Sequence, residues 1–164
     1  MKRFVSSLVL AAAICALPRP SAAQQYLPAA SAYVGSGLEG GGRGFQRART
    51  RLRLGFELRM DEAPEDALVV AGLVDLEPRA AFGADLRYVR SLGPNFALSA
   101  GAVGYFVPAT LFGPCAGLEV RIPMSKRASF VAGPDVAVFA LGTDLPDGIV
   151  IWQALMQGGL RVDF

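Results

Sequence analysis

The residues that most often carry chemistry in proteins are scarce in this sequence. Its 164 residues include no histidine, which excludes zinc sites built on His and Cys and catalysis by a histidine acid, base or triad. Cysteine occurs only as Cys15 and Cys115. We expect Cys115, which lies between Gly113 and Gly117, to face the interior of the fold as an inert small side chain.

Carboxylates and a glycine run supply the remaining candidates for a site. Catalysis by Asp75, Asp144 or Asp147 alone is conceivable, but acidic residues in loops are usually just solvated. The segment Gly40 to Gly44 reads GGGRG, without the lysine and the following helix of a phosphate-binding loop, so it predicts a hairpin tip. We therefore predict a protein that is not an enzyme, with no catalytic residue, no cofactor and no metal.

The first 23 residues have the pattern of a secretory signal peptide. Lys2 and Arg3 precede an apolar run from Phe4 to Leu17, and small residues close the segment at 21–23. The run is shorter than the roughly 20 residues of a spanning helix. We expect residues 1–23 to be removed and residues 24–164 to form one domain.

The charge of residues 24–164 is close to balanced. Three of the sixteen basic residues lie in the predicted signal peptide, which leaves thirteen against fourteen acidic ones. No block of Lys or Arg remains that could follow a phosphate backbone, so we predict no nucleic-acid partner. Cys115 is then a single cysteine, which excludes a disulfide within this part of the chain.

Hydrophobic residues alternate strictly with polar ones along much of the chain. Residues 50–60 read TRLRLGFELRM, with leucines and Phe56 on one face and three arginines with Glu57 on the other. A period of two predicts a strand with one apolar and one polar face. The same pattern predicts strands at 30–39, 48–60, 67–76, 79–90, 96–107, 110–122, 128–141 and 149–164.

The segment 67–76 is the weakest of these strands. Its sequence ALVVAGLVDL follows Asp66 and also fits a capped, buried helix. Its three valines and the regular spacing of the neighbouring segments favour a strand. Short connections rich in Gly and Pro join the predicted strands in order, as hairpins. The predicted fold is an all-β, antiparallel, up-and-down barrel of about eight strands.

The apolar face carries aromatic residues near both of its ends. The strands are about ten residues or longer, the length that a tilted strand needs to cross a bilayer. Two bands of aromatic residues, one near each end of the strands, are called girdles and are typical of transmembrane barrels. The predicted girdles are Phe82, Phe106, Phe112 and Trp152 at one rim and Tyr88, Phe96, Phe130 and Phe164 at the other. Between them we expect an uncharged band of Ala100, Ala102, Ala116, Leu118, Val136, Val138, Ala154 and Met156.

The opposite face combines charged residues with glycines. Turned inward, the charges can neutralise one another, and the glycines leave room for long side chains in the narrow interior of an eight-stranded barrel. The predicted interior charge network consists of Arg51, Arg53, Glu57, Asp85, Arg87, Glu119, Arg121 and Arg161. The same face also carries Asp75, Asp135, Gln153 and Gln157. We expect this interior to be closed and polar.

The last segment resembles the C-terminal assembly signal of bacterial outer-membrane barrels. It presents Gln157, Gly159, Val162 and Phe164 in alternating register; Val162 departs from the pattern, in which an aromatic residue is common. With the signal peptide and the strands, the chain is similar to the small OmpA- and OmpX-type barrels. The resemblance implies a Gram-negative outer-membrane location, lipid contacts, assembly by the barrel-assembly machinery and a monomer.

These features favour a structural, envelope-stabilising role for a closed outer-membrane barrel. Periodicity alone does not tell which face points inward. The alternative from another class is a secreted, soluble barrel or sandwich that binds a small apolar ligand, with Leu52, Leu54 and Phe56 turned inward. A narrow, porin-like outer-membrane pore for small solutes is the other alternative.

Overall fold

The computed structural model describes residues 26–42, 44, 46–60, 63–77, 79–143, 145 and 149–164. The predicted signal peptide 1–23 lies outside these residues, so the proposed boundary at residue 24 stays a prediction. No helix in the described part of the chain is long and apolar enough to cross a membrane.

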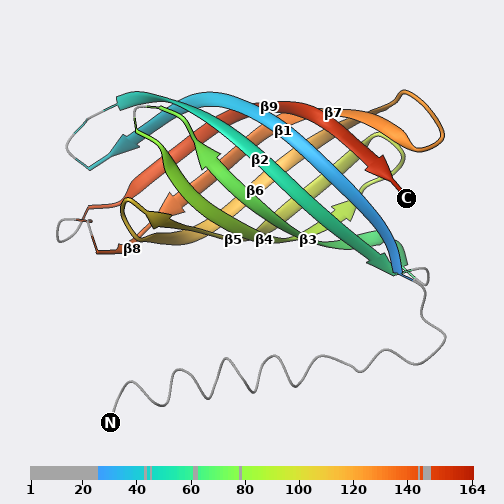
Figure 1. Ribbon diagram of the computed structural model, residues 1–164, viewed down its shortest axis with the longest axis horizontal. Helices are drawn as coiled ribbons and strands as arrows, with labels where there is room; N and C mark the ends of the chain where they lie inside the picture. The colour runs from blue at the N-terminus through green and yellow to red at the C-terminus, as the bar shows by residue number, and fades with distance from the viewer. Residues whose placement is uncertain are drawn as a thin grey trace, which may run out of the picture.

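Nine strands make up the described chain, in the order in which Figure 1 labels them. They are β1 (Tyr26–Gly41), β2 (Gln46–Met60), β3 (Ala63–Asp75), β4 (Ala81–Ser91), β5 (Phe96–Val107), β6 (Leu111–Pro123), β7 (Ala128–Phe139), β8 (Leu141–Gly142) and β9 (Ile151–Asp163). The two-residue β8 follows β7 after one residue and pairs with the beginning of β6, so it extends the position of β7 in the sheet.

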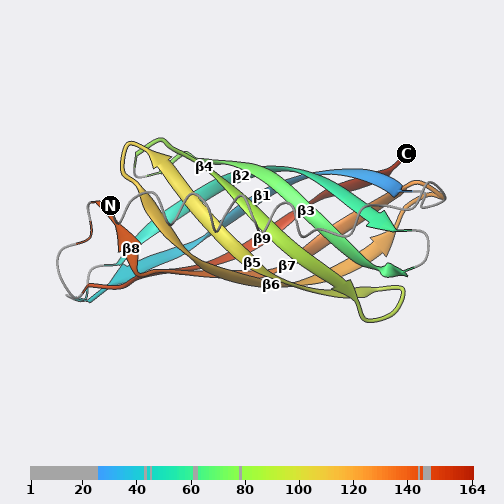
Figure 2. The same ribbon diagram turned by 90° about the horizontal axis from the view of Figure 1, so that it is seen from below.

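The eight long strands form a closed antiparallel barrel. Each pairs with its neighbour in sequence, β5 pairs with β6, and β9 pairs with both β7 and β1. Figures 1 and 2 show the strands tilted around a common elongated axis. Closure satisfies the backbone donors and acceptors that an open edge would leave unpaired. The predicted fold class, an all-β up-and-down barrel of eight strands, is confirmed.

The segment 67–76 is a strand, as predicted, and its odd-numbered residues point inward. Ala67, Val69, Ala71 and Leu73 are buried. Their side chains point into the barrel, and β3 is paired with β2 on one side and with β4 on the other. Other predicted boundaries shift by a few residues. The largest shifts are at β1, which begins at Tyr26 and not at residue 30, and at β3, which begins at Ala63 and not at residue 67. β1 starts early because it pairs with β2 from Tyr26 onward.

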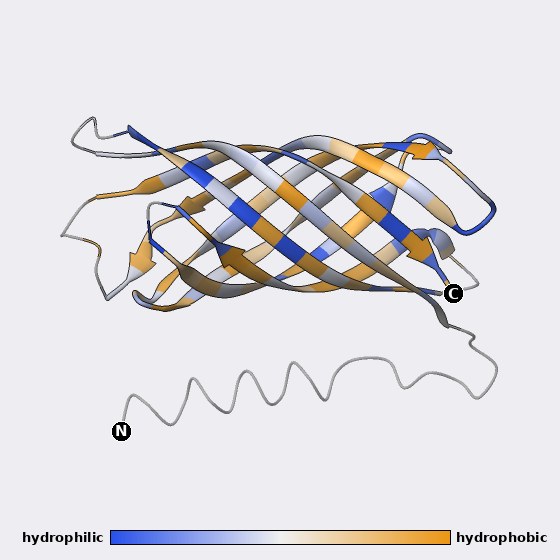
Figure 3. Cartoon of the chain, turned by 45° about the horizontal axis from the view of Figure 1, so that its top comes forward, coloured by the Kyte–Doolittle hydropathy of each residue, from blue (hydrophilic) through white to orange (hydrophobic). Residues whose placement is uncertain are grey.

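The inward-facing strand residues are odd-numbered along the whole barrel. The long ladders pair residues of equal parity, for example Arg51 with Asp75 and Tyr33 with Gly159. The exceptions are the terminal pairs Met60–Ala63 and Phe82–Val107, at register shifts, and the short β6–β8 ladder. One alternation of faces therefore continues through all hairpins, and Figure 3 shows the matching alternation of hydropathy along the strands.

Inward glycines allow the strands to bend closely around the interior. A Cβ on Gly159 would lie 1.9 Å from the Ala32 carbonyl oxygen, at the seam where β9 meets β1. Six inward glycines would bring a Cβ within 2.5 Å of a backbone oxygen of the neighbouring strand. They are Gly37, Gly83, Gly101, Gly113, Gly133 and Gly159.

The barrel has two ends, the turn end and the loop end. The turn end contains Tyr26 and Phe164, whose backbone N–H donates to the Pro28 carbonyl at 3.1 Å. The loop end is the opposite one, where β1 finishes at Gly41 and β9 begins at Ile151.

Candidate functional site

The outward face of the barrel is apolar and carries aromatic residues near both ends. The girdle at the loop end has exposed fractions of 38–54% and the girdle at the turn end 39–69%, so all eight predicted aromatic side chains point outward. Between the girdles Val136, Val138 and Met156 are 46, 41 and 64% exposed.

Two girdle aromatics also cover a glycine on the adjacent strand. Trp152 is the cross-strand partner of Gly40, and Phe112 is the partner of Gly104. A Cβ on either glycine would lie within 2.6 Å of the facing ring, which leaves no room for another residue. The missing side chains of these glycines leave space that the rings occupy.

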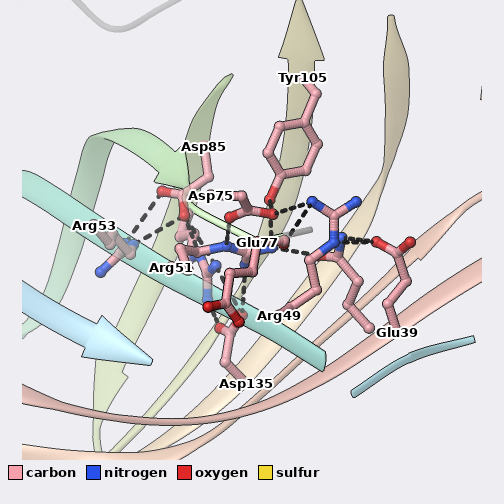
Figure 4. A network of polar contacts seen from close by, with 11 residues as sticks. Glu39, Arg49, Arg51, Arg53, Asp75, Glu77, Asp85, Tyr105 and Asp135 are labelled. Atoms are coloured by element: carbon pink, nitrogen blue, oxygen red, sulfur yellow. Dashed lines mark hydrogen bonds and ion pairs between the residues drawn. The ribbon is translucent and has the colours of Figure 1, made fainter. Parts of the chain in front are cut away.

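The inward face holds a continuous chain of ion pairs, called here the central network. It consists of Glu39, Arg49, Asp75, Arg51, Asp135, Arg87, Asp85 and Arg53, in an order that alternates acid and base. All eight residues are at most 6% exposed. They come from β1, β2, β3, β4 and β7, and Figure 4, which labels all of them except Arg87, shows their side chains pointing toward one another.

The loop-end half of the central network begins at Glu39. Its carboxylate accepts hydrogen bonds from Arg47, from Arg49 Nε at 2.7 Å and from Gln153 Nε2 at 2.7 Å. Arg49 Nη1 also donates to Asp75 Oδ2 at 3.2 Å, and Arg51 Nε donates to Asp75 Oδ1 at 2.9 Å. Asp75 thus joins two arginines from the neighbouring strand β2.

Asp135 links this half to the other half of the network. Its carboxylate lies 3.6 Å from Arg51 Nη1 and accepts hydrogen bonds from Arg87. Arg87 Nε also donates to Asp85 Oδ2 at 3.0 Å. Asp85 in turn receives two hydrogen bonds from Arg53, at 2.9 and 3.2 Å. The planar guanidinium fork allows one arginine to bridge two carboxylates.

Neutral side chains use the remaining hydrogen-bonding capacity of the central network. Tyr105 donates to Asp75 Oδ2 at 2.8 Å and accepts from Arg51. Gln153 accepts from Arg51 while its amide donates to Glu39. The Arg53 guanidinium lies 5.4 Å from the centre of the Tyr33 ring, which adds a cation–π contact.

Two smaller ionic groups lie outside the central network. The turn-end cluster consists of Glu57, Arg59, Arg161 and Asp163; Arg161 holds Glu57 with two hydrogen bonds of 2.9 and 3.0 Å and also contacts Asp163. Glu119 and Arg121, on β6, pair with each other at 2.9 Å, and Arg121 also donates to Ser91 at 3.2 Å.

The structure therefore divides the predicted interior network into three groups. Four predicted residues, Arg51, Arg53, Asp85 and Arg87, join the central network. Glu57 and Arg161 lie in the turn-end cluster, and Glu119 and Arg121 form the separate pair. The sequence interpretation omitted Glu39, Arg49 and Tyr105; all three share the odd numbering of the polar face, which was the available signal.

The expectation of a polar interior needs correction. Buried apolar residues from β3 to β7, among them Leu73, Val103 and Phe139, pack together near the loop end. A second cluster contains Ala67, Val69, Val89 and Ala97. The β3 segment is apolar on both faces, so its alternation gave no indication of this packing.

Charge in the interior is balanced. Among the described residues, the buried charged side chains comprise six arginines and six carboxylates: Arg49, Arg51, Arg53, Arg87, Arg121 and Arg161 with Glu39, Glu57, Asp75, Asp85, Glu119 and Asp135. A buried charge without a partner is strongly unfavourable. Because the numbers are equal, each buried arginine can be neutralised by a buried carboxylate.

The geometry provides little for catalysis in the described part of the chain. Asp75 is fully buried and engaged by Arg49, Arg51 and Tyr105. Cys115 is buried and free of disulfide bonds. No group of His, Cys, Asp and Glu in the described ranges could hold a metal ion. Asp144 and Asp147 lie outside the described residues.

The four predicted assembly-signal residues lie on both faces of the chain's last segment. Gln157 and Gly159 face inward, and Gln157 is 8% exposed. Val162 and Phe164 face outward at 39 and 69% exposure. Recognition of these residues by an assembly machine stays a prediction.

Comparison with known proteins places the fold among transmembrane barrels. No family model matches the chain, and no curated protein matches its sequence. The crystal structure of Neisserial surface protein A (NspA) matches with a TM-score of 0.58 at 10% identity, over 86% of this chain and 99% of that one. At this identity the likeness is one of fold.

Two further solved structures resemble the chain more distantly. A designed transmembrane β-barrel matches at 10% identity, TM-score 0.45, over 83% of this chain and 95% of its own. Ail, the attachment invasion locus protein of Yersinia pestis, solved with the heparin analogue sucrose octasulfate, matches at 11% identity, TM-score 0.48, over 82 and 98%. The match to NspA, together with the closed eight-stranded topology, shows that the chain has the fold of the small outer-membrane β-barrels.

Proposed function

We propose that this protein is an integral outer-membrane barrel whose interior is sealed and whose role is to stabilise the envelope. One observation carries the proposal: the apolar residues face outward between two aromatic girdles, and the paired charges face inward. A soluble barrel has the opposite arrangement, because water favours polar residues on the outside.

The outward face supports a lipid environment. Leu54 and Phe56, which the soluble alternative places inside, are 56 and 48% exposed. Exposed apolar surface on this scale is unfavourable in water and favourable in hydrocarbon. Aromatic girdles at both ends match the two interfaces of a bilayer. Outer-membrane lipid is therefore the main proposed partner.

The inward face supports a sealed interior. The central network connects β2 with β4 and β7 across the barrel through Arg51, Asp135 and Arg87. Eight strands enclose a space that side chains can fill. The apolar cluster around Phe139 occupies a further part of the interior towards the loop end. These contacts favour the sealed barrel over the narrow pore.

Four parts of this proposal follow from the sequence pattern and from the site. The signal peptide directs export, and the outward Phe164 with the pattern of β9 is recognised by the barrel-assembly machinery. The described acids of the interior are engaged by arginines, which supports a role without catalysis. The closed ring, with no free edge for pairing, supports a monomer.

Cell fractionation with gel electrophoresis tests the location. The protein should be found in the outer-membrane fraction, and unheated samples should migrate differently from boiled ones because the folded barrel resists detergent. Recovery in the soluble periplasm, with identical migration before and after boiling, would contradict the proposal.

Conductance across planar lipid bilayers tests the sealed interior. Purified monomer should insert without stable ion-conducting events. The variant Asp135→Ala, which opens the middle of the central network, is the matched comparison, because it should leak if the network is the seal. A stable pore in the unmodified protein would favour the alternative of a pore for small solutes.

A further inference from the structure

One ion pair stands apart on the apolar outward face. Among the even-numbered positions of the described strands, which point outward, Asp66 and Arg90 are the only charged residues. They are cross-strand partners on β3 and β4, near the turn end. Tyr88, a residue of the turn-end girdle, precedes Arg90 on the same face of β4. A charged pair on a lipid-facing wall needs a polar environment.

Asp66 and Arg90 satisfy each other only in part. Arg90 Nε lies 3.9 Å from Asp66 Oδ1, which is an ion-pair distance but too long for a hydrogen bond. Asp66 Oδ1 accepts no hydrogen bond from any described residue. The Arg90 side chain is 58% exposed and the Asp66 side chain 29%. The Tyr88 side chain also interacts with both Asp66 and Arg90. The exposed Arg90 guanidinium still has donors for a ligand, and Asp66 Oδ1 is still an unused acceptor.

An apolar hollow begins beside this pair. It has a volume of about 400 Å³, is lined by Arg90 and Tyr88, and extends across β5, β6 and β7. Its other lining residues include Leu98, Ala100, Ala116 and Val136.

The hollow exists because small residues meet across the strands. Ala100 is the cross-strand partner of Ala116, and this alanine pair lies between Tyr88 on one side and Val136 on the other. Larger residues, Leu98 and Leu118, form the next row. Apolar walls without partner atoms lose dispersion contacts, so an acyl chain is favoured in this space.

The geometry points to a specific site for one phospholipid with an ethanolamine headgroup. Arg90 binds the phosphate, Asp66 accepts hydrogen bonds from the primary ammonium, and an acyl chain lies in the hollow over Ala100 and Ala116. Opposite charges on adjacent strands match the two charges of this headgroup. Tyr88 places the site at the depth of a membrane interface. This inference rests on the proposed membrane location.

Native mass spectrometry of the detergent-folded full barrel tests the site. The probes are phosphatidylethanolamine, phosphatidylcholine and phosphatidylglycerol with identical acyl chains. Phosphatidylethanolamine should be retained about tenfold more tightly than the other two, because choline has no N–H donor and glycerol carries no cation. Equal retention of all three lipids would overturn the inference.

Variants assign the contributions of the headgroup and of the hollow. Asp66→Asn should abolish the preference for the ethanolamine lipid over the choline lipid. Arg90→Gln should lower the retention of all three lipids. Ala116→Leu fills the hollow and should reduce retention about tenfold; Ala100→Leu fills it from β5 if the first variant does not fold. Ala32→Leu, at an exposed outward alanine on β1 whose cross-strand partners Leu54 and Leu160 do not line the hollow, is the matched control and should retain lipid normally.

Other outcomes separate this site from the proposed function. If the barrel inserts into bilayers but Ala116→Leu and Ala32→Leu retain lipid equally, the site is wrong and the proposed function stands. If the protein does not insert into bilayers at all, both fail.

Discussion

Gly158 and Gly159 are neighbours in β9, yet the two faces that they belong to impose different constraints. A Cβ on the inward Gly159 would lie 1.9 Å from a backbone oxygen of β1, whereas a Cβ on the outward Gly158 would first meet the Phe130 ring at 3.6 Å. The inward face is restricted in both shape and charge. Except under the girdle rings at Gly40 and Gly104, the outward face tolerates changes of shape, but the surrounding lipid excludes charge from its middle.

The largest effect is expected from an excess positive charge in the interior. Asp135→Ala leaves Arg51 and Arg87 without a shared carboxylate in the middle of the central network, and it should lower the free energy of unfolding by about 3–5 kcal/mol. Urea unfolding in lipid vesicles measures this change. The outward neighbour Val136→Ala is the control and should lose much less. Equal losses for the two variants would remove the distinction between the faces.

A charge added to the outward face should have the next largest effect. Leu54→Arg places a guanidinium on the outward face in the middle of β2 and should destabilise the barrel in lipid vesicles by about 2–4 kcal/mol. Thr50→Arg, on the same face nearer the loop end, should have a much smaller effect because its charge reaches the interface. An unchanged stability of Leu54→Arg would mean that water and not lipid surrounds this face.

Adding a methyl group at Gly158 or Gly159 changes the shape of one face of β9 without changing its charge. Gly159→Ala should destabilise the barrel by about 1–3 kcal/mol, because the strands must move apart. Gly158→Ala should be close to neutral, because its Cβ has ordinary contacts. The same unfolding measurement applies to both variants, and the idea of a tight seam fails if they unfold together.

The smallest effect is expected in the turn-end cluster. Arg59→Ala removes contacts with Glu57 and Asp163, but the Asp163 side chain is 31% exposed and Arg161 still holds both acids. The loss should stay below about 1 kcal/mol because water screens these charges. A loss as large as that of Asp135→Ala would show that the turn end is as dry as the middle.

The sequence predicted which face each residue occupies more reliably than it predicted partners. Strict alternation from Arg51 to Arg59 is a local signal, and it placed the strand and its inward charges correctly. The contact between Arg51 and Asp135 depends on the stagger of strands that are distant in sequence, and no local pattern records that stagger. The girdle residues could be found because lipid organises them by depth.

The apolar part of the interior could not be predicted from alternation. In β3, Val69 and Leu73 face inward while Leu68 and Val70 face outward, so both faces look alike in the sequence. Glu39 and Arg49 were missed for another reason. They lie at or near the ends of the predicted strands 30–39 and 48–60. At strand ends, alternation has too few neighbouring residues to assign a face, although the odd numbering of both residues matches the polar face.

Trp152 permits the most direct test of the central claim, that the outward face lies in lipid. It is the only tryptophan of the chain, it is 38% exposed on the outward face, and it belongs to the loop-end girdle. Its fluorescence can be measured after folding into vesicles whose lipids carry bromine at chosen depths. We predict strong quenching that is greatest for bromine near the headgroups. No quenching at any depth, or quenching greatest at the bilayer centre, would contradict the account.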